Sequence, residues 1–141
     1  MKTKKRLLLA VVVCVLSFAF VSNTFAYSVT FSNKKIYGGT PQIVMNSIPP
    51  SGPNLTVKIM AGTQFNNESN ICFRAYEEDI YGVSARRSAL IKFFTSDWSP
   101  GQTKSAAYIN GGATASALDT RGSIPNTNAT AYAVFYGKIT M

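Results

Sequence analysis

Apolar and polar residues alternate through most of the chain after residue 26, and a period of two predicts β-strands. Leu55, Val57 and Ile59 fall on one side of such a strand, with Thr56 and Lys58 on the other. The other runs with this alternation are residues 28–31, 42–45, 71–76, 89–94 and 129–140. Apolar residues do not recur at helical spacing beyond two turns. The pattern therefore favours an all-β chain.

Segments rich in Gly, Pro, Asn and Ser separate these runs and predict turns. These segments are residues 34–40, 47–54, 62–70, 77–84 and 95–103. Between residues 105–109 and 113–118 lies Asn110-Gly111-Gly112, and Asn-Gly supplies the positive φ angles of a tight hairpin turn. We therefore predict a hairpin there. Because alanine is a poor strand former, a short helix over residues 104–108 is the alternative.

About seven to nine short strands within residues 27–141 predict a single antiparallel β-sandwich or small barrel. No internal repeat and no linker divides residues 27–141. We therefore expect one β domain over residues 27–141.

Residues 1–26 have the three-part order of a secretory signal peptide. The basic residues that begin it are Lys2, Lys4, Lys5 and Arg6. An uncharged apolar run follows at residues 7–21, and Thr24-Phe25-Ala26 resembles a cleavage site. As a helix, that run would be about 22 Å long, which is short for a bilayer core of roughly 30 Å. We expect cleavage after Ala26 and a secreted, extracellular protein, and we favour a Gram-positive bacterium as its source.

The chain contains no histidine, which argues against Ser-His-Asp and Cys-His catalysis and against the commonest zinc ligand. After removal of residues 1–26, Cys72 is the one cysteine left, so no internal disulfide forms. The alternation around Cys72 predicts a buried thiol, with pairing between chains as the alternative.

The acidic residues do not suggest an active site. They are Glu68, Glu77, Glu78, Asp79, Asp97 and Asp119. Adjacent side chains such as Glu77 and Glu78 diverge on a strand, whereas glycoside hydrolysis needs two carboxyls facing one another. Residues 77–82 are typical of a solvated turn and lack the spacing of a calcium loop. We therefore expect no catalytic residues, no metal and no cofactor, and an enzyme using Glu or Asp is the weakest hypothesis.

Aromatic residues are more numerous than a core of this size requires. Tyr132 and Tyr136 fall on one side of the last predicted strand together with Lys138, and Trp98 lies in a predicted loop. Exposed Trp and Tyr side chains commonly bind sugar rings or protein partners. The candidate binding residues are therefore Trp98, Tyr132, Tyr136, Lys138 and Arg86, with Lys138 or Arg86 contacting an anionic group. The alternative is that the tyrosines contact apolar material and Trp98 closes one end of the core.

Four of the 14 basic residues lie in residues 1–26, which leaves 10 basic and 6 acidic residues. This dispersed excess is too small for a nucleic-acid interface but suits an anionic wall polymer or lipid surface. The first hypothesis is a secreted, non-enzymatic binding module for a cell-wall polymer, a glycan or a protein. The alternative is a membrane-active toxin or bacteriocin-like protein, in which residues 113–118 and 129–136 rearrange into a transmembrane hairpin.

Overall fold

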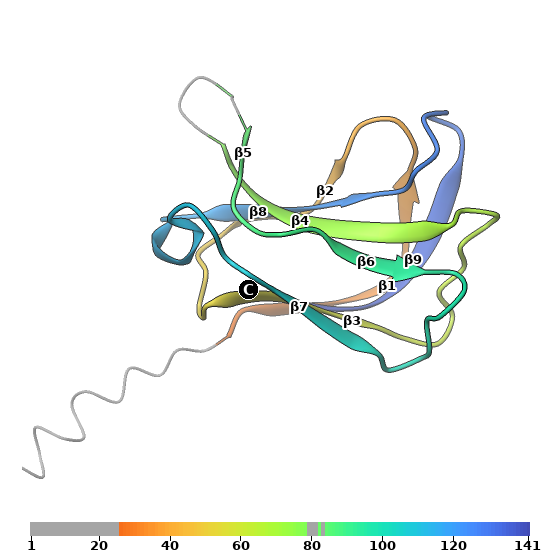
Figure 1. The fold of residues 1–141 in the computed structure, drawn as a ribbon, viewed down its shortest axis with the longest axis horizontal. Helices are drawn as coiled ribbons and strands as arrows, with labels where there is room; N and C mark the ends of the chain where they lie inside the picture. Colours follow the sequence, from red (N-terminus) through yellow and green to blue (C-terminus); the bar gives the residue numbers. More distant parts are fainter. Residues whose placement is uncertain (1–25, 79–81, 83) are drawn as a thin grey trace, which may run out of the picture.

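The computed structural model describes residues 26–78, 82 and 84–141. Nearly all of the predicted signal peptide lies outside these residues. The described residues form nine strands and one 3-10 turn. The strands make two antiparallel sheets that lie face to face and do not close into a barrel (Figure 1). The all-β prediction is thus confirmed in its sandwich form. In the described part of the chain no helix is long and apolar enough to cross a membrane.

One sheet has four strands in the order β1-β9-β3-β7. Their bounds are β1 Ser28–Tyr37, β3 Asn54–Ile59, β7 Thr103–Ala107 and β9 Tyr132–Thr140. Strand β9 pairs with β1 along one edge and with β3 along the other, so the last strand lies inside the sheet.

The other sheet has five strands, in the order β2-β8-β4-β5 with β6 also paired to β4. Their bounds are β2 Gln42–Ile48, β4 Asn70–Glu78, β5 Ser84–Arg86, β6 Ile91–Phe94 and β8 Leu118–Ser123. Strand β8 pairs with one edge of β4, and β5 and β6 pair with successive parts of its other edge.

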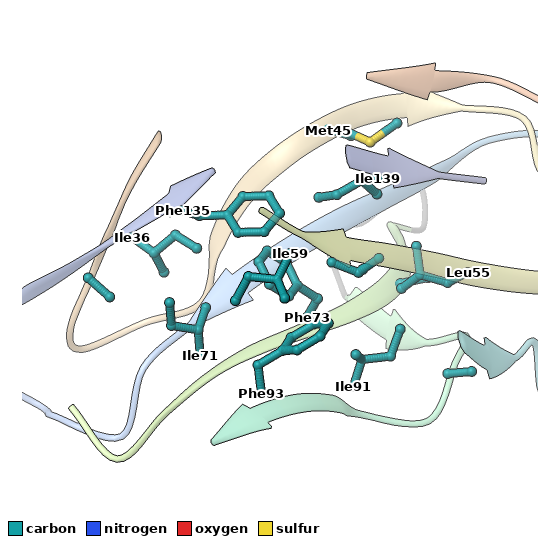
Figure 2. Close-up of a cluster of buried hydrophobic side chains, with 14 of the residues drawn as sticks. Ile36, Met45, Leu55, Ile59, Ile71, Phe73, Ile91, Phe93, Phe135 and Ile139 are labelled. Carbon is teal, nitrogen blue, oxygen red and sulfur yellow. The ribbon is translucent and has the colours of Figure 1, made fainter. Parts of the chain in front are cut away.

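The core fills the space between the two sheets with buried apolar side chains (Figure 2). Leu55, Val57 and Ile59 are fully buried, as are Phe73 and Phe135. The Phe73 and Phe135 ring centroids lie 4.7 Å apart, so these rings join the two sheets. Burial of such side chains contributes about 1.5–3 kcal/mol each to stability.

Strand β1 is longer than predicted, because a β-bulge changes which side of the sheet its residues face. The register with β9 shifts between Phe31 and Lys34, and Asn33 there has a φ of 60°. Phe31 before the bulge and Ile36 after it both pack toward the core, although an unbroken strand would place them on opposite sides. Residues 34–37 therefore belong to the strand rather than to a turn.

The predicted hairpin over residues 105–118 is wrong, and so is the alternative helix over residues 104–108. Asn110 and Gly111 have positive φ angles, as expected, but they lead into a 3-10 turn at Gly112–Thr114. The chain then crosses to the other sheet, where β8 begins at Leu118. A Cβ on Gly112 would lie 2.6 Å from the Arg87 carbonyl oxygen, so this crossing requires glycine.

Candidate binding faces of the sandwich

The Glu77 and Asp119 carboxylates make separate local contacts. Glu77 forms an ion pair with Arg87 at 2.7 Å. The Asp119 carboxylate accepts a hydrogen bond from the Ser47 backbone N–H at 2.8 Å. Glu77 and Glu78, which the sequence assigned to a turn, belong to strand β4, and most of the rest of that segment lies outside the described residues. Among the described residues, no three His, Cys, Asp or Glu side chains gather where they could hold a metal ion.

The outer side of the four-stranded sheet brings together three of the predicted binding residues. Tyr132, Tyr136 and Lys138 alternate with the buried Ala133, Phe135 and Ile139, so all three point away from the core. Strand pairing adds Lys35 and Tyr37 from β1 and Lys58 from β3. We call this surface the tyrosine–lysine face: Lys35, Tyr37, Lys58, Tyr132, Tyr136 and Lys138.

The tyrosines of this face are held by specific contacts. Tyr37 and Tyr132 are register partners whose ring centroids lie 5.8 Å apart. The Lys35 Nζ lies 4.6 Å from the centroid of the Tyr132 ring, a cation–π contact. A Cβ on Gly62 would lie 3.2 Å from Tyr136 Cγ, so the absence of a side chain there lets the Tyr136 ring lie against the backbone.

Lys58 and Lys138 occupy directly opposite positions on β3 and β9, and both are exposed. The Cβ atoms of such partners lie about 5 Å apart, and like charges so placed are destabilising. The outward positions around the pair carry hydroxyl side chains, and no acidic residue lies on the strands of this sheet. These hydroxyl residues are Ser28, Thr30, Thr56, Thr103, Ser105 and Thr140. The face is therefore cationic without a carboxylate to neutralise it.

The structure separates the two other predicted binding residues from this face. Arg86 lies on β5 in the five-stranded sheet, opposite Tyr76. Trp98 lies in the loop between β6 and β7 and is partly buried against the core, with its ring centroid 5.6 Å from that of Phe65. The contacts of Trp98 match the alternative in which it closes one end of the core.

A second basic surface, which the sequence did not indicate, lies on the outer side of the five-stranded sheet. Arg74 on β4 and Arg121 on β8 are register partners, and Lys92 on β6 is opposite Cys72. The alternation over residues 71–76 predicts which side chains of β4 point outward, but residues 118–123 lack the apolar alternation that predicts a strand. The sequence therefore does not predict that Arg121 pairs with Arg74.

Cys72 is buried, as predicted, although it lies on the outer side of its strand. Its thiol donates a hydrogen bond to the Asn70 side-chain oxygen at 2.8 Å. Burial raises the pKa of the Cys72 thiol, and the positive charges of Lys92 and Arg74 act in the opposite direction. Less of the thiolate, the reactive form, is therefore present than in an exposed cysteine.

Comparisons with protein-family models, with curated proteins and with solved structures found no match. Function is therefore inferred from the geometry and charge of the two sheet faces.

Proposed function

We propose that this protein is a secreted, non-enzymatic binding module that holds an anionic cell-wall polymer against its tyrosine–lysine face. The observation that carries this proposal is the opposed pair Lys58 and Lys138 on an exposed strand surface without carboxylates. An arrangement of like charges lowers stability in the free protein, and an anion lying between or along the charges removes that penalty.

The shape of the face suits an extended polymer. Lys138 and Val134, the register partner of Lys35, are four residues apart on β9, a separation of roughly 13 Å along an antiparallel strand. Positive charges distributed over this length match repeated phosphate or carboxylate groups better than one small ion. A chain laid along the row would also meet the Tyr132 and Tyr136 rings, whose apolar faces pack against sugars.

Co-sedimentation with purified Gram-positive walls tests the proposal. Three samples are compared: intact walls, walls stripped of their phosphate-bearing polymer, and anionic lipid vesicles. We expect binding to intact walls alone. A basic residue near an anionic surface contributes about 1 kcal/mol, which is about fivefold in affinity. The double variant Lys58→Gln/Lys138→Gln should therefore bind roughly 25-fold more weakly.

A matched control removes the same charge from the opposite sheet. The double variant Arg86→Gln/Lys92→Gln should keep wall binding within about twofold, because neither residue lies on the tyrosine–lysine face. Equal losses in both double variants would contradict the proposal, since net charge rather than this face would then determine binding. Equal binding to stripped walls would exclude the anionic polymer, and preferential vesicle binding with leakage would favour the membrane-active hypothesis.

A further inference from the structure

Two arginines occupy opposite positions on neighbouring strands of the five-stranded sheet. Arg74 on β4 and Arg121 on β8 are register partners on its outer side. The guanidinium of Arg121 lies 4.9 Å from the centroid of the Tyr76 ring, which restrains its position. This pair lies on the sheet opposite the tyrosine–lysine face.

Both arginines are partly buried, and their polar groups are incompletely satisfied. The Nε atoms of Arg74 and Arg121 are shielded from solvent and have no hydrogen-bond acceptor among the described residues. A buried donor left in this state costs stability, and more so when it belongs to a charged group. An acceptor supplied by a ligand would remove that cost.

Nearby carboxylates neutralise only part of the positive charge. Asp119 lies 3.8 Å from Arg121, beyond hydrogen-bond distance, and it already accepts a hydrogen bond from Ser47. Within the described part of the chain, Arg74 has no carboxylate within ion-pair distance. Glu78 is exposed on the same side of β4, two residues beyond Tyr76 and four from Arg74.

We propose that Arg74 and Arg121 form a discrete site for a phosphate group, separate from the tyrosine–lysine face. Each guanidinium presents N–H donors in a planar fork that matches the oxygens of a phosphate. Two forks on adjacent strands can bind one tetrahedral anion from two sides. Lys92 adds a third positive charge on the neighbouring strand β6, beside Cys72.

Nuclear magnetic resonance of the purified protein tests the site, with the arginine Nε–H signals followed during titration with inorganic phosphate. We expect saturable shifts at Arg74 and Arg121 that sodium chloride of equal ionic strength does not produce. Dimethyl phosphate, a phosphodiester, is the second probe. Stronger binding of the diester would point to a polymer backbone, and stronger binding of inorganic phosphate to a free ion or a terminal phosphate.

Two substitutions separate loss of the site from loss of the fold. Arg74→Gln removes one of two opposed charges, so its thermal midpoint without phosphate should equal or exceed that of the original protein, while phosphate affinity falls at least tenfold. Arg74→Lys keeps the charge but lacks the planar fork, and it should also bind more weakly. Lys58→Gln should retain full phosphate binding.

The proposal is overturned if the Nε–H signals do not respond to phosphate beyond the chloride control. It is also overturned if folded Arg74→Gln binds phosphate as well as the original protein, or if Lys58→Gln weakens binding equally. None of these outcomes depends on the wall-binding experiment, because that experiment substitutes neither Arg74 nor Arg121.

Discussion

Replacement of Lys138 by glutamate should stabilise the free protein while weakening its binding to an anionic polymer. Lys138 lies directly opposite Lys58, and both side chains are exposed. Two unit charges about 6 Å apart in water interact by about 0.7 kcal/mol, which is an upper value because flexible side chains move apart. Changing repulsion into attraction should therefore raise the free energy of unfolding by about 0.5–1 kcal/mol.

Urea is the appropriate denaturant for this measurement, because guanidinium chloride is itself a salt that screens charges. The gain from Lys138→Glu should be largest at low ionic strength. It should disappear in 1 M NaCl, where the Debye length is about 3 Å. The double variant Lys58→Glu/Lys138→Glu again places like charges opposite one another, so its stability should return toward that of the original protein.

A double-mutant cycle over these variants isolates the interaction between the two positions. A destabilising Lys138→Glu would refute the reasoning. So would a gain that persists unchanged in 1 M NaCl, or strictly additive effects of the two substitutions, because each would mean that the lysines do not repel one another in the folded protein.

Three further predictions concern the core and its titratable groups. Phe135→Ala should lower the free energy of unfolding, measured in urea, by about 3–5 kcal/mol. The reason is that Phe135 is fully buried and its ring centroid lies 4.7 Å from that of Phe73. A loss below about 1 kcal/mol would contradict the position of Phe135 in the core. Burial raises the pKa of Tyr108 from 10.0 to about 12. The unfolded chain releases this proton first, so the stability of the folded protein should fall as the pH rises from 10 to 12. The stability of Tyr108→Phe, compared by thermal melts, should fall less steeply over the same range. Parallel pH profiles of the two proteins would contradict this prediction. Burial raises the pKa of the Cys72 thiol. Alkylation of Cys72 at pH 8, followed by mass spectrometry, should therefore be slower in the native protein than in urea. Faster labelling of the native protein would contradict this prediction.

The side chains of the core were largely predictable, because alternation assigns each residue of a regular strand to one side. This held for Leu55, Val57 and Ile59 and for Phe135 and Ile139, all of which are buried. It failed for β8, where the inward positions hold Leu118, Thr120 and Gly122. Thr120 is fully buried and donates a hydrogen bond to the Met141 sulfur. Because a polar residue and a glycine face inward, β8 lacks the alternation of apolar residues that predicts a strand.

The candidate sites were less predictable, because they depend on strand order. The alternation placed Lys58 and Lys138 on the polar sides of their strands, but the two residues are 80 positions apart in the chain. Their pairing requires β9 to lie beside β3. Arg74 and Arg121 likewise meet only because β8 lies beside β4. Local periodicity carries no information about either pairing.

The most direct test of the proposed function is to map the binding surface by nuclear magnetic resonance. Backbone amide signals are followed while a soluble fragment of phosphate-bearing wall polymer is added at physiological salt. We predict shifts concentrated on β1, β3 and β9 around Lys35, Lys58, Tyr132 and Lys138, and their loss in Lys58→Gln/Lys138→Gln. Shifts confined to β4 and β8, or no shifts at all, would contradict the assignment of polymer binding to the tyrosine–lysine face.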